Sequence, residues 1–184
     1  QRVDLNSWKI GETPEGNGYS LLRKSNYAPP HRSPRNIALL DNIVVSDFQL
    51  DARLQSTVKD YNHRSMVVVF GYQDPAHFYY VHFGKKTDDH ANQIFIVNDA
   101  PRVKISTKTT PGTAWDDEWH RVRIARDVRS GETAVYFDDM QSPVMTAVDK
   151  TFDWGHIGIG AFDDLGNFDD VVLRGIPVQP PADR

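Results

Sequence analysis

Hydrophobic and polar residues alternate along much of the chain, and helical periodicity is scarce. The segment 48–55 is the clearest case, because every second residue from Phe48 to Leu54 is apolar. Strict alternation predicts a strand with one face toward a core and the other toward water. The segment 66–70 (MVVVF) is apolar throughout, which indicates a strand that is buried on both faces.

Further strands are predicted where short β-prone runs are bounded by turn residues. They lie at residues 77–83, 93–97, 102–106, 119–126, 133–137, 156–162 and 168–173. Turn-forming residues separate them at 73–75, 98–101, 129–131 and 165–167. Strands spaced by turns along a whole chain predict an all-β fold in which two antiparallel sheets pack as a sandwich.

Length and composition suit a single domain. The chain has 184 residues, of which 39% are hydrophobic, and this is enough for one large core. We expect the domain to cover residues 1–176 and a Pro-rich C-terminal tail to cover residues 177–184. The Pro-rich segment 25–36 is expected to be a surface loop.

Charge and composition also narrow the partners. The formal net charge of −4 does not provide the basic face that nucleic acid requires. No apolar run approaches the roughly 20 residues that span a bilayer, so no membrane span is expected. The absence of cysteine excludes a disulfide framework and thiol chemistry. The sequence begins at Gln1 rather than Met, which favours an upstream segment, such as a signal peptide, that has been removed.

Several motifs follow one another in an order that is typical of a known superfamily. They are the strand at 48–54, Phe70-Gly71, the aromatic segment 78–80, W-H-R-V-R-I at 119–124, a hairpin at 134–139, G-H-I-G-I-G at 155–160 and F-D-D-V-V-L at 168–173. In these motifs the chain resembles the concanavalin A-like lectin/glucanase superfamily. The resemblance is particularly to its bacterial laminin-G-like and 3-keto-disaccharide hydrolase-like jelly-roll domains.

The resemblance implies a two-sheet antiparallel jelly-roll β-sandwich whose concave sheet face binds a polysaccharide or oligosaccharide. It also implies a bacterial-type protein that is secreted, periplasmic or on the cell surface. The Glu-x-Asp-x-x-Glu run of the family-16 glucanases is absent from the sequence. Ordinary glycoside hydrolysis, which uses two carboxyl groups across the scissile bond, is therefore not supported.

The richest segment for binding chemistry is 61–98, which holds four of the seven histidines. Alternation within 77–83 places Tyr80 and His82 on one face and Val81 with Phe83 on the other. The face with Val81 and Phe83 is expected in the core, so Tyr80 and His82 are expected on the open, ligand-facing surface. The full set of predicted ligand-binding residues is His63, Arg64, Tyr80, His82, Lys85, His90 and Gln93.

Two other functions remain open for the same residues. The first is a polysaccharide or keto-sugar lyase that acts by β-elimination, with Tyr80 or His82 as the base or acid. Arg64, Lys85 and Gln93 would hold the carboxylate of the sugar. The second is protein adhesion, as in laminin-G-like domains. The same aromatic residues could also simply be sheet packing. Trp119 and Trp154 are interpreted as core or rim anchors.

Acidic residues near the last turn indicate a metal. Domains that resemble this one often hold a structural calcium ion near the F-D-D-V strand, which implies Asp169 or Asp170 as a ligand. Asp163, on the other side of the same turn, is the third predicted ligand. The alternative is that these residues are turn formers. Zinc could use the imidazoles of the 61–98 segment, but no H-x-x-x-H or H-E-x-x-H motif supports it.

Overall fold

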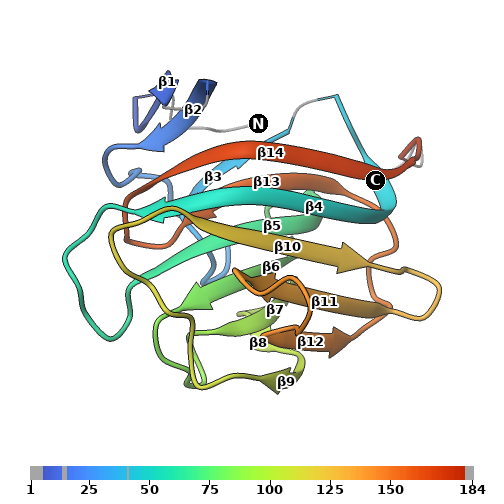
Figure 1. The fold of residues 1–184 in the computed structure, drawn as a ribbon. Helices are drawn as coiled ribbons and strands as arrows, with labels where there is room; N and C mark the ends of the chain where they lie inside the picture. Colours follow the sequence, from blue (N-terminus) through green and yellow to red (C-terminus); the bar gives the residue numbers. More distant parts are fainter. Residues whose placement is uncertain (1–5, 14–15, 41, 181–184) are drawn as a thin grey trace.

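The computed structural model describes residues 6–13, 16–40 and 42–180, which form strands, turns and loops and no helix. Its two antiparallel sheets face one another as a sandwich (Figure 1). Within the described residues there is no helix that could cross a membrane. The all-β jelly-roll sandwich that the sequence predicts is confirmed.

The first sheet has eight strands in the order β1-β2-β14-β4-β10-β11-β12-β9. Their bounds are Trp8–Thr13, Gly16–Leu21, Gly166–Pro177, Val45–Ser56, His120–Arg126, Glu132–Phe137, Met145–Val148 and Ser106–Thr109, respectively. The second sheet has six strands in the order β3-β13-β5-β6-β7-β8. Their bounds are Asn36–Leu39, His156–Ala161, Ser65–Asp74, His77–Gly84, Gln93–Asn98 and Val103–Lys104.

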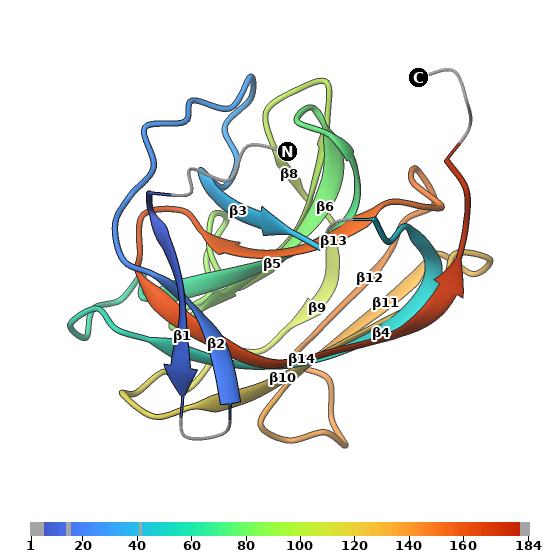
Figure 2. The ribbon, with the colours of Figure 1, turned by 90° about the horizontal axis from the view of Figure 1, so that it is seen from above.

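Strands that are distant in sequence are neighbours in both sheets. The last strand, β14, pairs with β4, and β13 pairs with β5 and β3. Figure 2 shows β14, β4 and β10 in one layer and β3, β13 and β5 in the other. The last strands of the chain therefore pair with early ones. Each sheet has an inner face toward the other sheet and an outer face.

The main core lies between the inner faces. Alternation in β4 behaves as predicted, since Phe48, Leu50, Ala52 and Leu54 are all buried there. Val81 and Phe83 of β6 join the same cluster, as expected. The first six residues of β5 are buried, which agrees with a strand covered on both faces.

A second apolar cluster covers the outer face of the six-stranded sheet. It consists of Val67, Val69, Phe78, Tyr80, Phe95 and Val97, against which Ile37, Tyr72 and Phe162 pack. The segment between β2 and β3, which includes the predicted Pro-rich loop, lies on this side of the sheet (Figure 2). The outer face of this sheet is therefore partly covered by other parts of the chain.

Some predicted boundaries are wrong. Residues 102–106 do not form one strand, because β8 ends at Lys104 in one sheet and β9 begins at Ser106 in the other. Gly166 opens β14 instead of lying in a turn. The same strand reaches Pro177, and the amide of Val178 donates to the carbonyl oxygen of Val44 at 3.0 Å. Strand pairing thus extends slightly past the predicted start of the C-terminal tail.

Candidate functional site

The predicted open face around Tyr80 and His82 is buried. Tyr80 is 0% exposed and His82 is 5% exposed. The ring of Tyr80 stacks on Phe95 with 5.0 Å between the centroids, and His82 lies edge-on to Phe162 at 5.6 Å. The prediction that these two side chains reach solvent is therefore wrong, because neighbouring strands and loops supply a second layer of aromatic residues over them.

Arg102 packs against the aromatic residues that cover Tyr80 and His82. Its guanidinium carbon lies 4.7 Å from the ring centre of Phe95 and 4.6 Å from that of Phe162. Its Nη1 donates to the phenol oxygen of Tyr80 at 2.9 Å. Burial raises the pKa of Tyr80. Burial, together with the charge of Arg102, lowers the pKa of His82 to about 3, so the imidazole is neutral. Neither group can reach a polysaccharide in this arrangement.

The remaining predicted binding residues do not share one surface. Arg64 is 1% exposed, and its guanidinium donates to Ser56 and, at 2.8 Å, to Asp117. Gln93 is also buried and donates to the carbonyl oxygen of Asp88 at 3.0 Å. Arg64 and Gln93 therefore stabilise neighbouring segments by hydrogen bonds. The prediction that they line an open concave face is wrong.

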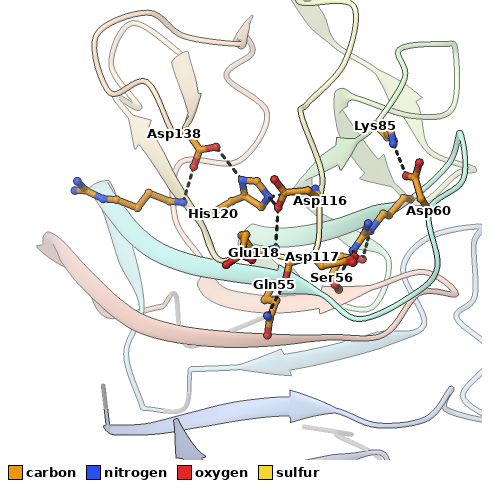
Figure 3. A network of polar contacts seen from close by, with 11 residues as sticks. Gln55, Ser56, Asp60, Lys85, Asp116, Asp117, Glu118, His120 and Asp138 are labelled. Carbon is orange, nitrogen blue, oxygen red and sulfur yellow. Dashed lines mark hydrogen bonds and ion pairs between the residues drawn. The ribbon is translucent and has the colours of Figure 1, made fainter. Parts of the chain in front are cut away.

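Three predicted residues are on the surface but separately engaged. His63 lies 3.7 Å from a carboxylate oxygen of Asp88. Lys85 forms an ion pair with Asp60 (Figure 3). His90 is exposed, and its carbonyl oxygen accepts from Arg102 at 3.3 Å. They border the covered face and do not form a groove with Tyr80 and His82.

The predicted calcium ligands are also dispersed. Asp163 lies 3.7 Å from the ammonium of Lys24, and Asp170 lies 3.7 Å from the guanidinium of Arg53. Asp169 is buried and accepts from the backbone amide of Asp170. Over the described ranges, no group of three carboxylates, imidazoles or thiols is placed to hold a metal ion. The three aspartates therefore do not fit a common site, and calcium stays a prediction without a geometry.

A polar network at one end of the sandwich fixes the start of β10 (Figure 3). The Nδ1 of His120 lies 2.8 Å from Asp138, and its Nε2 lies 3.1 Å from Asp116. The ring is 5% exposed and stacks on Phe137 with 4.7 Å between the centroids. Both ring nitrogens are thus engaged, so His120 is an anchor. It sets the direction of its two sequence neighbours, Trp119 and Arg121, toward the outer face.

A groove of about 620 Å³ lies on this outer face of the eight-stranded sheet. We call it the Trp119 groove. It is lined by Asp51, Ala52, Arg53, Trp119, Arg121, Val122, Arg123, Asp170, Val172 and Arg174. The residues come from β4, β10 and β14, which are adjacent in the sheet, and from Trp119 just before β10.

Ion pairs hold most of the charged side chains of the groove in place. Asp51 accepts from Nε of Arg123 at 2.7 Å and from Nη1 of Arg174 at 3.3 Å. Partial burial raises the pKa of Asp51, but hydrogen bonds from Arg123 and Gln49 outweigh it, and the pKa is lowered overall. The Asp51 carboxylate is therefore firmly ionised and orients two guanidinium groups.

A distortion of β14 shapes the rim. The register of β14 against β4 shifts between Asp169 and Val172, which marks a β-bulge or irregularity. Within it, Asp170 has a φ of +49°, a conformation that costs energy for residues other than glycine. The distortion leaves Asp170 3.7 Å from Arg53 at the groove. Such irregularities commonly re-aim a side chain beside a binding site.

Trp119 supplies the aromatic surface of the groove. It is half-buried, and the guanidinium carbon of Arg53 lies 5.4 Å from its ring centre. From the sequence, this residue is expected to be a core or rim anchor rather than a ligand contact. The alternation in 119–126 already places Arg121 and Arg123 on one face, but only the structure shows that the facing positions of β4 and β14 complete a groove.

A second groove, of about 650 Å³, runs along the edge between β14 and β2 of one sheet and β3 and β13 of the other. Its lining is largely aliphatic, with Leu39, Leu40, Ile43, Ile157 and Leu173 among the contributing residues. It lacks the mixture of cations, carboxylates and an indole that marks the Trp119 groove, which is therefore the better candidate site.

No protein-family model and no curated protein sequence match this chain. Solved structures do. The carbohydrate-binding module CBM66 from Bacillus subtilis aligns with a TM-score of 0.63 at 16% identity, over 92% of this chain and 96% of that chain. The winged bean acidic lectin in complex with methyl-α-D-galactose aligns with a TM-score of 0.52 at 11% identity, over 97% and 96%. The GH43 protein BlXynB from Bacillus licheniformis aligns with a TM-score of 0.58 at 9% identity, over 96% of this chain and 36% of that chain.

These alignments establish the fold. The chain has the concanavalin A-like jelly-roll fold, as the sequence resemblance implies.

Proposed function

We propose that this concanavalin A-like jelly roll is a carbohydrate-binding domain that holds its sugar in the Trp119 groove. The observation that carries the proposal is the half-buried indole of Trp119 among oriented guanidinium and carboxylate groups. An indole offers apolar area to the C–H face of a pyranose, and the charged groups can bind its hydroxyls. Pockets that combine apolar surface with a few oriented polar groups are typical ligand sites.

The ion-paired side chains of the Trp119 groove favour a ligand-binding function over a surface without function. Asp51 holds Arg123 and Arg174 before a ligand arrives, so less side-chain entropy is lost when a sugar binds. The distortion of β14 places Asp170 at the rim, and such irregularities are over-represented beside binding sites. Both features concern the groove and neither contributes to the main core.

The carboxylates of the groove favour sugar binding over sugar hydrolysis. Hydrolysis needs one carboxyl group that is protonated and another that acts as base or nucleophile. The two carboxylates that line the groove are Asp51, whose pKa is lowered, and Asp170, which faces Arg53. The lyase alternative loses its named base and acid, because Tyr80 and His82 are buried. Protein adhesion would be favoured by an apolar patch, whereas the groove is rich in charge.

Comparison with known structures supports a sugar as the partner. A carbohydrate-binding module and a galactoside-bound lectin share the fold with this chain. Because the fold hosts several functions, the proposal rests on the groove itself. Polysaccharides are met mainly outside the cytoplasm, so we also propose a secreted, periplasmic or cell-surface location.

The test is binding to a panel of neutral and acidic polysaccharides, measured by affinity gel electrophoresis and calorimetry without added enzyme. We expect binding without release of reducing ends. Trp119→Ala should abolish it, while Trp154→Ala, a change at a half-buried indole outside the groove, should leave it intact. Equal binding by the wild type and Trp119→Ala would refute the assignment of the groove, and a panel with no bound polysaccharide would refute the function.

A further inference from the structure

We infer that the Trp119 groove selects an anionic sugar and that Arg121 is the residue that contacts the anion. This inference rests on the proposed function and names its substrate class. The anion could be a uronate carboxylate or a sulfate ester, because a guanidinium binds either with paired N–H donors.

The first observation is a pair of like charges. Arg121 of β10 and Arg53 of β4 are directly opposite in the antiparallel register. Side chains at such positions have Cβ atoms about 5 Å apart, and like charges placed there destabilise the sheet. Natural sequences keep such a local conflict mainly where function requires it.

The second observation is how the groove charges are paired. Four arginines and two aspartates line it. Asp51 engages Arg123 and Arg174, while Asp170 and the indole of Trp119 lie against Arg53. Arg121 is exposed, and in the described part of the chain its guanidinium has no hydrogen-bond or ion-pair partner.

The nearby acidic residues do not supply that partner. One carboxylate oxygen of Asp138 accepts from the backbone amide of Arg121 at 2.9 Å, and the other contacts His120. Asp116 is bound to His120, and Asp117 is bound to Arg64. The lining of the groove therefore has an excess of two positive charges, although the whole chain has a net charge of −4.

An anionic group on a bound sugar would relieve this conflict. With the ring against Trp119, a carboxylate or sulfate beside Arg121 would neutralise the guanidinium group that has no partner and would weaken its repulsion of Arg53. The contact should be screened by salt, because the groove is open to solvent. A neutral sugar would leave the charge of Arg121 uncompensated.

The experiment compares matched ligands that differ only in charge. Polygalacturonate is tested against its fully methyl-esterified form, and dextran sulfate against dextran, at 50 and 300 mM salt. We expect binding of at least one anionic member, roughly tenfold or more weaker binding of its neutral partner, and loss of affinity at high salt. Arg121→Gln should weaken the anionic ligand roughly tenfold, while Arg129→Gln, at an exposed turn, should have no effect.

The outcomes separate this inference from the proposed function. Binding by uronate but not sulfate, or the reverse, supports it and identifies the anion. If the neutral and anionic polysaccharides of a pair bind with equal affinity and Arg121→Gln does not change that affinity, the inference that the groove selects an anion is wrong. The proposed function survives in that case provided that Trp119→Ala still abolishes binding, and it fails if Trp119→Ala has no effect.

Discussion

The guanidinium of Arg102 lies between the rings of Phe95 and Phe162 and donates a 2.9 Å hydrogen bond to the phenol oxygen of Tyr80. Through this contact the loop before β8 covers the aromatic cluster on the outer face of the six-stranded sheet. Tyr80 is thus part of a second apolar cluster and His82 is buried beside it, whereas the Trp119 groove lies on the other sheet.

The first prediction concerns this cover. Arg102→Ala removes two cation–π contacts and leaves the buried hydroxyl of Tyr80 without its donor. We expect a loss of about 2 kcal/mol in the free energy of unfolding. Urea denaturation measures it, with Arg129→Ala at an exposed turn as the control. Equal midpoints for Arg102→Ala and the wild type would mean that the cover does not stabilise the fold.

The second prediction is a pH dependence from His82. Its pKa is about 3 in the folded protein and 6.5 as an ordinary value, so the unfolded chain takes up a proton that the folded protein does not. This contribution to stability is complete above pH 6.5 and is lost as the pH falls toward 3, by up to about 1.4 kcal/mol per pH unit. His82→Asn keeps an acceptor for the amide of Asn92 but cannot be protonated.

The measurement is urea denaturation of the wild type and His82→Asn at several pH values between 7.5 and 4.5. We expect the stability of the wild type to fall more steeply than that of the variant. Parallel curves would show that His82 does not stay neutral in the folded protein.

The third prediction concerns the approach of β13 to β3. A Cβ atom at Gly160 would lie 1.9 Å from the carbonyl oxygen of Asn36, so the two strands would have to separate. Gly160→Ala should reduce the free energy of unfolding by at least about 2 kcal/mol. Gly11→Ala is the matched control, because a Cβ atom there meets nothing closer than a lysine carbon at 4.0 Å. Similar stabilities for the two variants would contradict the close packing of β13 against β3.

Much of the fold could be predicted from the sequence, because half-buried strands alternate strictly. The pattern at Phe48–Leu54 reports burial of one face, and the apolar run from Met66 to Phe70 reports burial of both. The sequence pattern does not predict β1, β2, β3 and β12. They are only four to six residues long, and β1 and β2 are rich in glycine and polar residues, so the alternation is too short or too weak to mark them. In addition, β2 pairs with β14 and β3 with β13, which are distant in sequence.

The candidate site was harder to predict for a physical reason. Alternation in 77–83 separates Tyr80 and His82 from Val81 and Phe83, but it does not show which further segments cover either face. Phe162 and Arg102, which cover Tyr80 and His82, lie at least 20 residues away in sequence. The Trp119 groove likewise requires β4, β10 and β14 to be adjacent and β14 to be distorted, and local patterns do not report either feature.

In the proposed complex, the sugar lies against Trp119 on the outer face of the eight-stranded sheet. NMR of the ¹⁵N-labelled protein tests it most directly, because each of the four tryptophans gives one indole N–H signal that can be followed during titration with a bound oligosaccharide. We predict that the Trp119 signal shifts with saturation while the Trp154 signal stays in place. A saturable shift at Trp154 or elsewhere, with the Trp119 signal unchanged, would contradict the account.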